Sequence, residues 1–150
     1  MQDDYALGPI RAGQIVPAFA LLRAFNSQMS IERWQDITGQ GRWTIIVATD
    51  CVGYVRGMTL SSACMHPIAH RLLDIPILIA GSVLDEKTIA DLLFREAKRR
   101  AIVLRCDFMR IWTWTPDIPD RLDDLPFYQR WNHGLIHCLT PAVVRSLDDN

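Results

Sequence analysis

One stretch of the sequence, residues 72–131, alternates between strand and helix patterns and so limits the folds that the chain can adopt. Ile75–Val83 is an apolar run typical of a buried strand, and Lys87–Ala101 carries apolar residues at helical spacing. Met109–Thr115 alternates like a second strand, and a short helix, Leu125–Trp131, with the aromatic run Phe127–Trp131, follows it. A helix between two strands is the usual crossover of a parallel pair. We therefore predict that these strands are parallel neighbours in an α/β sheet.

The predicted helix 87–101 has one apolar face and one charged face. Its apolar residues recur with the period of a helix that packs against a sheet. They are Ile89, Leu92, Leu93, Ala97 and Ala101. Asp85 is placed to cap the N-terminus of this helix, and Arg99 and Arg100 suit the negative end of its dipole.

The rest of the chain supplies shorter elements around this unit. We predict strands at Tyr5–Arg11, Trp43–Thr49, Val52–Leu60 and Leu135–Leu139, helices at Val16–Phe25 and Ser30–Ile37, and loops at Ser61–His70 and Pro116–Pro126. Ser30 is a good N-cap for its helix. Pro76 lies inside the predicted central strand and has no N–H to donate to a neighbour. We expect either a bulge there or an early position in the strand.

Length and composition limit the class of protein. With 150 residues, 49% of them hydrophobic, the chain can bury a core of its own, and we expect residues 1–150 to form one domain. The net charge of -1 gives no basic excess for nucleic acid, and no apolar run reaches the ~20 residues of a membrane span. The cysteines form no CxxC pair and the N-terminus lacks an apolar leader. We therefore expect a cytoplasmic protein with reduced thiols.

Three short segments carry a resemblance to a known family. They are Asp50-Cys51-Val52-Gly53-Tyr54 at the predicted hairpin turn, Leu92-Leu93-Phe94 with Ala97 on the predicted helix, and Phe127-Tyr128-Gln129-Arg130-Trp131-Asn132-His133. In this order, together with the order of the elements, they resemble the GNAT superfamily of acetyl-CoA-dependent N-acetyltransferases. The resemblance spans nearly the whole chain. It implies a single-domain fold with a mixed, strongly twisted sheet of about six or seven strands flanked by helices.

The resemblance implies that acetyl-CoA is the acyl donor, and it assigns residues to this molecule. The residues that would hold the pantetheine arm through free backbone groups, as a strand adds to a sheet edge, are Gly81, Ser82 and Val83. Those that would offer amides to the pyrophosphate are Lys87, Thr88 and Ile89. The family's loop reads Arg/Gln-x-x-Gly-x-Gly/Ala, whereas segment 83–90 contains no glycine. Asp85 and Glu86 put negative charge where a pyrophosphate would lie.

For catalysis, the resemblance assigns Tyr128 as the acid that protonates the departing thiolate. A tyrosine hydroxyl, with an ordinary pKa near ~10, is close enough to a thiol to share a proton with it. A backbone N–H near Val83 would stabilise the charge that develops on the carbonyl oxygen. The base that takes the amine proton is left open among Glu32, Asp50, Asp117 and a chain of water molecules. The acceptor is left open between a small molecule and a protein N-terminus or lysine, and the oligomeric state between a monomer and a homodimer.

Two other functions fit the same residues. Because the glycine loop is missing, one alternative is a GNAT-like binding or regulatory module that has lost coenzyme binding and catalysis. A weaker alternative is a thiol or metal hydrolase built on Cys64, His66 and His70. The spacing of the cysteines and histidines does not supply the four ligands of a structural zinc site, so we predict no metal.

Overall fold

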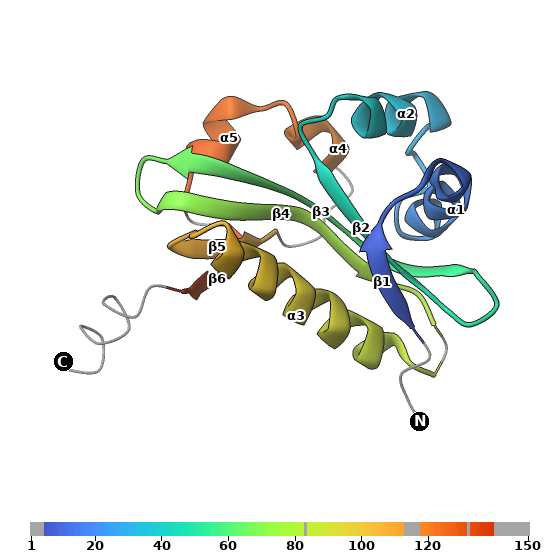
Figure 1. Cartoon of the computed structure of the whole chain (residues 1–150). Coiled ribbons are helices and arrows are strands. Elements are labelled where there is room, and N and C mark those ends of the chain that lie inside the picture. Colours follow the sequence, from blue (N-terminus) through green and yellow to red (C-terminus); the bar gives the residue numbers. More distant parts are fainter. Residues whose placement is uncertain (1–4, 83, 113–117, 132, 140–150) are drawn as a thin grey trace.

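The structure is a computed structural model that describes residues 5–82, 84–112, 118–131 and 133–139. These residues form a six-stranded mixed sheet with helices on both faces, which confirms the predicted α/β fold (Figure 1). The strands are β1 (Ala6–Pro9), β2 (Thr44–Thr49), β3 (Val55–His66), β4 (His70–Ala80), β5 (Phe108–Ile111) and β6 (Leu135–Cys138). The helices are the single turn η1 (Ala12–Gln14), α1 (Ile15–Phe25), α2 (Ile31–Gly39), α3 (Glu86–Val103), α4 (Ile118–Arg121) and α5 (Leu125–Gln129).

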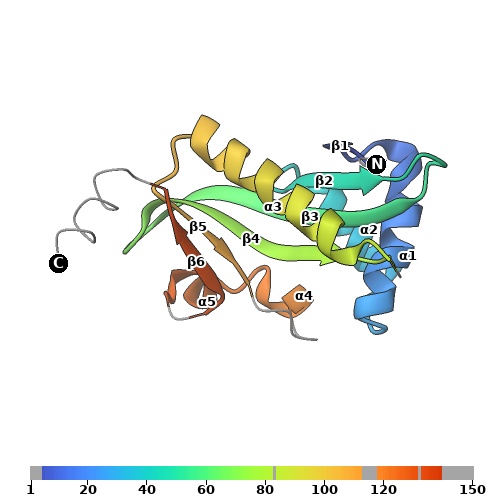
Figure 2. The same ribbon diagram turned by 90° about the horizontal axis from the view of Figure 1, so that it is seen from below.

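The strands follow one another across the sheet in the order of the sequence. β4 and β5 are parallel, as the crossover helix predicts, and the other neighbouring strands are antiparallel. α3 connects β4 to β5 and covers one face, while α1, α2, α4 and α5 lie on the other (Figure 1, Figure 2). The parallel pair therefore lies between two layers of helices.

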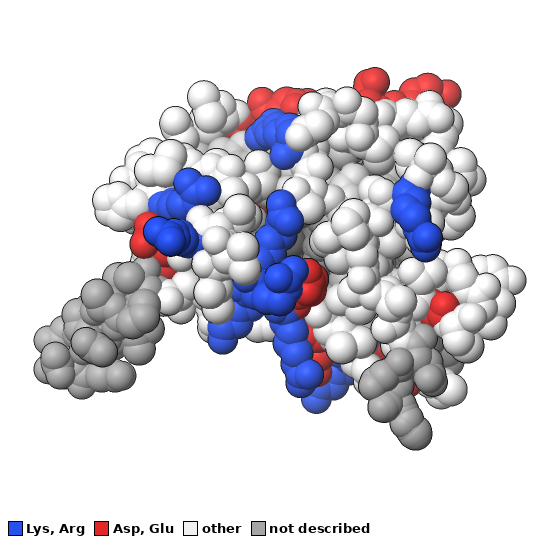
Figure 3. All heavy atoms as spheres, in the orientation of Figure 1, with Lys and Arg blue, Asp and Glu red and all other residues white. Residues whose placement is uncertain are grey.

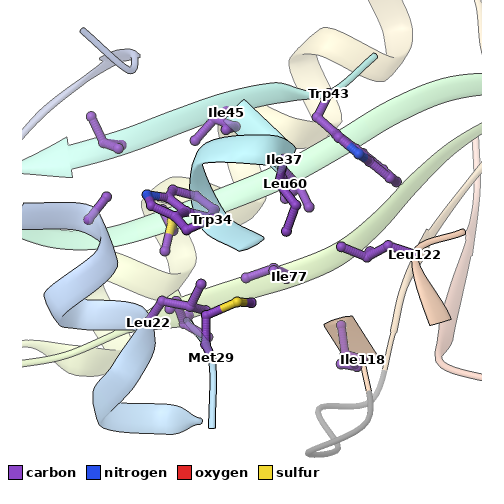
Figure 4. Packing of buried hydrophobic residues seen from close by; sticks show 14 of the residues in the cluster. Leu22, Met29, Trp34, Ile37, Trp43, Ile45, Leu60, Ile77, Ile118 and Leu122 are labelled. Atoms are coloured by element: carbon purple, nitrogen blue, oxygen red, sulfur yellow. The ribbon is translucent and has the colours of Figure 1, made fainter. Parts of the chain in front are cut away.

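The larger core lies between the sheet and the layer that contains α1 and α2. Leu22 and Trp34 of these helices belong to one buried cluster with Leu60 and Ile77 of the sheet, and Ile118 of α4 joins it (Figure 4). On the other face, α3 packs through the predicted apolar stripe. The buried residues of this stripe are Ile89, Leu93, Ala97 and Ala101.

Side-chain hydrogen bonds fix the start of α2 as predicted. The Oγ of Ser30 accepts the N–H of Arg33 at 3.1 Å. Trp34 then donates its Nε1–H to the carbonyl of Ile15 at 2.9 Å. This second bond satisfies the indole of a fully buried tryptophan and joins α2 to the first turn of α1.

The prediction of a loop is wrong for two segments. The segment Ser61–His70 is mostly sheet, because β3 continues to His66 and β4 begins at His70. Its serines, alanines and cysteine suggest a loop by composition, but cross-strand pairing with β4 overrides that weak preference. His66 closes the tight turn, since its Nδ1 accepts the N–H groups of Ile68 and Ala69 at 3.0 and 3.2 Å. Within the predicted loop Pro116–Pro126, the chain forms α4 and begins α5.

The predicted bulge at Pro76 is confirmed. Leu60 pairs with Ile77 and Ser62 pairs with Asp74, so β4 has one more residue than β3 between these two pairs. Ile75 and Pro76 together lie opposite Ser61, and a bulge is a position in a sheet where the missing N–H of a proline is tolerated. Among the described helices, none is long and apolar enough to cross a membrane.

Candidate functional site

The parallel strands β4 and β5 stay together for only part of the length of β4. Their pairing runs from Leu72 opposite Phe108 to Ile75 opposite Ile111. One further bond, from the N–H of Trp112 to the carbonyl of Ile75 at 3.0 Å, ends the ladder among the described residues. Figure 2 shows β4 continuing beyond the end of β5. The second half of β4 therefore has an edge that the described part of β5 does not cover.

Hydrogen-bond geometry identifies the groups on this open edge. The N–H of Gly81 donates to the carbonyl of Arg56 at 2.7 Å, so Gly81 faces β3. Because backbone groups alternate along a strand, the N–H and C=O groups of Leu78 and Ala80 face the open edge. The expectation that Gly81 offers a free N–H is therefore wrong. Ser82 Oγ accepts the N–H of Asp85 at 3.3 Å, and Val83 lies outside the described residues.

A buried ion pair lies where the two strands begin to part. Asp74 and Arg110 stand opposite each other in the parallel register, and neither side chain has exposed surface. The carboxylate accepts bonds from Arg110 Nε at 2.9 Å and from its Nη2 at 2.7 Å. It also accepts the Nε1–H of Trp112 at 2.7 Å. Sequence reasoning missed this pair, although an aspartate in an apolar strand and an arginine in the next are a signal, because buried charges require partners.

The same arginine attaches α5 to the sheet. Arg110 Nη2 donates to the carbonyl of Tyr128 at 3.1 Å, and its Nη1 donates to the carbonyl of Arg130. At the other end of the helix, the carboxylate of Asp124 accepts the N–H of Phe127 as an N-cap. The short helix that carries Tyr128, which the sequence predicts at Leu125–Trp131, is thus held at both ends.

Tyr128 packs beside the point where the strands part, and its hydroxyl is buried. Its ring lies 5.1 Å from the ring of Trp112 and 6.4 Å from that of Trp43, measured between centroids. The guanidinium of Arg42 lies 5.0 Å from the ring centroid. The hydroxyl has no hydrogen-bond partner among the described residues. Burial raises the pKa of Tyr128 above its ordinary value, so the hydroxyl is protonated at neutral pH but is a weaker acid than the sequence argument assumes.

The N-terminus of α3 offers little to a pyrophosphate. Lys87 and Thr88 are exposed there, but Ile89 is a core residue whose N–H donates to the carbonyl of Asp85 at 2.9 Å. The carboxylate of Asp85 accepts the hydroxyl of Tyr5 at 2.7 Å, and this bond raises the pKa of Tyr5. Figure 3 shows Lys and Arg side chains gathered over the middle of α3.

A cavity of about 290 Å³ lies beside this helix end, and its charge balance is negative. Among the described residues that line it, Asp50 and Asp85 carry carboxylates and Arg56 carries the single guanidinium. Asp50 accepts three N–H groups of the β2–β3 turn, from Val52, Gly53 and Tyr54, and pairs with Arg56 Nε at 2.9 Å. Two carboxylates against one cation repel a dianion, so the cavity does not fit a pyrophosphate.

Of the three candidate bases, the described structure favours none. Desolvation works to raise the pKa of Asp50, but hydrogen bonds from Tyr54, Arg56 and the turn amides outweigh it and lower the pKa. A carboxylate held in this way is a weak base, and its role is to shape the turn. Glu32 is exposed on the first turn of α2, and Asp117 lies outside the described residues.

A second, smaller cavity of about 130 Å³ lies between α5 and the β3–β4 hairpin, and Tyr128, Cys64 and His66 all line it. Burial raises the pKa of Cys64, which disfavours a nucleophilic thiolate. His66 already uses Nδ1 in the turn, and His70 is exposed with a positive φ of 62°. The described residues contain no cluster of three or more metal-ligating side chains. These contacts do not support the hydrolase alternative.

Comparison with known proteins gives the class of fold. No family model and no curated protein sequence matches this chain. Among solved structures, the GNAT family N-acetyltransferase YhbS from Escherichia coli in complex with CoA has a TM-score of 0.66 at 17% identity, covering 93% of this chain and 86% of that one. The NatC complex bound to Gag peptide and CoA gives 0.65 at 19% identity, covering 92% and 100%.

A third likeness is to the GCN5-related glucosamine N-acetyltransferase region of a fungal multi-domain GH3 β-N-acetylglucosaminidase. The TM-score is 0.64 at 12% identity, and the match covers 77% of this chain and 14% of that one. This chain therefore spans a small part of that protein's length. The chain has the fold of the GNAT N-acetyltransferases, which confirms at the level of fold the resemblance seen in its sequence.

Proposed function

We propose that the protein transfers an acetyl group from acetyl-CoA to an amine. The observation that carries this proposal is the parting of β4 and β5 after Ile75, with Tyr128 packed against Trp112 at the same point. The fold is that of the N-acetyltransferase YhbS, which was solved with CoA, and of the NatC complex, which was solved with CoA and a peptide.

The open edge of β4 fits an extended amide-bearing arm. The N–H and C=O groups of Leu78 and Ala80 would pair with such an arm as they would with an added strand. Acetyl-CoA supplies an activated thioester. Tyr128 is the residue that would hold a proton for the leaving thiolate. Because its hydroxyl is a buried donor without a described partner, an acceptor atom placed beside it would remove an energetic cost of about 1–3 kcal/mol.

The alternative, a GNAT-like binding module without catalysis, is favoured by a different observation. Asp85 and Glu86 begin α3, and Asp50 adds a second carboxylate to the adjacent cavity. Helix N-termini bind phosphate through free amides and a positive dipole end. The carboxylates here oppose that binding, so the diphosphate of CoA would contribute little to affinity.

Calorimetry with two ligands tests both functions. S-Acetyl-pantetheine has the arm of acetyl-CoA without its diphosphate, so we expect the two ligands to bind with dissociation constants within about tenfold of each other. The double variant Asp85→Asn with Glu86→Gln removes two charges from the helix end and is expected to tighten acetyl-CoA but not acetyl-pantetheine. Turnover is then measured by mass spectrometry with a set of amines. If neither ligand binds at millimolar concentration, the acetyltransferase proposal is wrong and the binding module is favoured.

A further inference from the structure

The small cavity between α5 and the β3–β4 hairpin has walls that donate hydrogen bonds and carry positive charge. Arg42, Ser62, His66, Tyr128 and Gln129 contribute polar side chains. No carboxylate occurs among the described residues that line it. Its volume of about 130 Å³ suits one end of a small molecule rather than a peptide or a nucleotide.

Two of these side chains are buried polar groups. Tyr128 is 7% exposed and His66 is 6% exposed, and Tyr128 Oη has no hydrogen-bond partner among the described residues. His66 Nε2 makes no hydrogen bond of normal geometry there, but the backbone carbonyls of Tyr128 and Arg130 lie beside its ring and favour the protonated form. The Nδ1 of His66 accepts two N–H groups, so its proton is on Nε2, which is therefore a donor. An unpaired buried donor is costly, and an acceptor group bound beside the Tyr128 hydroxyl would satisfy it.

The positive charge of Arg42 beside the cavity favours an anion as that acceptor group. The guanidinium of Arg42 lies over the ring of Trp43 at 4.5 Å and over that of Tyr128 at 5.0 Å. Among the described residues, its one carboxylate neighbour is Asp123 at 3.8 Å, a long contact that Asp123 shares with Arg33 at 2.9 Å. The Nη1 of Arg42 also donates to the neutral carbonyl of Leu122 at 3.2 Å. Arg42 is thus incompletely neutralised beside the cavity. A planar carboxylate matches a guanidinium better than any other small anion of biology except phosphate.

The rim of the cavity is apolar. Met65 is 72% exposed and Leu125 is 64% exposed, and Pro67 lies between β3 and β4 at the same opening. A ligand with its carboxylate inside would place a hydrophobic side chain on these residues and remove them from water.

We propose that this cavity binds the carboxylate of the acceptor and that the acceptor is a free α-amino acid with an apolar side chain. This deepens the acetyltransferase proposal and rests on it, because Tyr128 is both a wall of the cavity and the residue to which that proposal assigns the thiolate's proton. The α-amine of an amino acid bound by its carboxylate lies within one carbon of the anchored group.

Titrations without any acyl donor test the site independently of catalysis. NMR shifts or tryptophan fluorescence of the full chain are followed with L-leucine, with 4-methylpentanoate, which lacks the amine, and with L-leucinamide, which lacks the carboxylate. We expect the first two to bind and the third to bind at least about tenfold more weakly. Equal binding of L-leucinamide, or saturable binding of inorganic phosphate alone, overturns the assignment of a carboxylate.

Matched variants locate the site. Arg42→Gln is expected to weaken L-leucine about tenfold or more, whereas Arg33→Gln, which contacts the same Asp123 but does not line the cavity, should change it less than twofold. His66→Asn keeps an acceptor for the turn amides and removes the Nε2–H, so it supplies a second test with the fold kept. Unchanged binding in both Arg42→Gln and His66→Asn overturns the proposal. If L-leucine binds as expected but is not acetylated in the presence of acetyl-CoA, the site stands and the acetyltransferase proposal fails.

Discussion

Replacing Asp74 with asparagine tests whether the buried ion pair fixes the apex of the candidate site, which is the point where β4 and β5 part. The side chains of Asp74 and Arg110 are both 0% exposed and are joined by two hydrogen bonds, at 2.9 and 2.7 Å. Asp74→Asn keeps the size of the side chain but leaves the charge of Arg110 buried without a counterion. Removing one partner of such a pair costs about 3–5 kcal/mol. We expect the free energy of unfolding to fall by that amount.

A double variant separates the charge from the position of α5. Asp74→Leu with Arg110→Met replaces the pair with apolar side chains, a change that elsewhere is neutral or stabilises by about 1–4 kcal/mol. In this protein it also removes the acceptor of Trp112 Nε1 and the donor to the carbonyls of Tyr128 and Arg130, at about 1–3 kcal/mol for each buried group left unpaired. We therefore expect a net loss of stability, together with lower turnover and unchanged affinity for acetyl-CoA, because α5 is no longer attached to β5.

Urea unfolding of the single and double variants gives the coupling free energy between the two residues. The matched control is Glu96→Gln, which breaks the exposed pair of Glu96 and Arg99 on α3, whose side chains are 27% and 64% exposed. Exposed pairs contribute about 0–1 kcal/mol. If Asp74→Asn costs no more than this control, the argument that the pair is a rigid support of the site is refuted.

Three further predictions concern packing, the tyrosine hydroxyl and pH. Gly57→Ala would place a Cβ 2.6 Å from Ile89 Cγ2, so we expect a loss of about 1–3 kcal/mol in thermal or urea unfolding. Gly13→Ala, where no atom lies within 4 Å, is the control, and equal losses would contradict the packing argument. Tyr128→Phe removes a buried unpaired hydroxyl, so stability should hold or rise while turnover falls roughly 10²-fold; a loss of stability with full activity would reverse this assignment. Burial lowers the pKa of His66 below its ordinary 6.5, so the unfolded chain takes up that proton first, and stability present above pH 6.5 is lost as the pH falls below it. His66→Asn should flatten this dependence in unfolding curves between pH 7 and pH 5, and an unchanged slope would exclude His66 as its source.

The features that the sequence predicts correctly depend on residues close together in the chain. The apolar stripe of α3, the Ser30 cap and the bulge at Pro76 follow from spacing or from one residue's chemistry. The pairing of Asp74 with Arg110 joins residues 36 positions apart, and only the register of two parallel strands brings them together. That register is set by packing across the whole sheet, which no local pattern contains.

Expectations about single atoms fail for a related reason. Gly81 directly follows β4, which ends at Ala80 rather than at the predicted Val83, and whether its N–H is free depends on which edge of the strand it faces. The bulge decides this, because the extra residue at Ile75–Pro76 reverses the edge that each later residue of β4 presents. The sequence can indicate a bulge without showing the register of the strand around it. The edge assigned to each later residue can then be wrong by one position, so that an N–H expected to be free is hydrogen-bonded instead.

Residues 74–76 decide where the parallel pair ends. The side chain of Asp74 holds Arg110 and Trp112 of the neighbouring strand, and the carbonyl of Ile75 accepts the last described backbone bond between the strands, from Trp112. Pro76 comes next, brings no N–H and shifts the register with β3. The strands are thus joined most firmly one residue before β4 is left with an open edge.

A groove that binds a ligand without rearranging must keep its shape when empty, and this requires a rigid apex. A buried ion pair is a poor choice for stability alone, since apolar side chains of the same volume serve as well. Its place at this apex is explained if its role is to hold the two strands and α5 at a fixed angle.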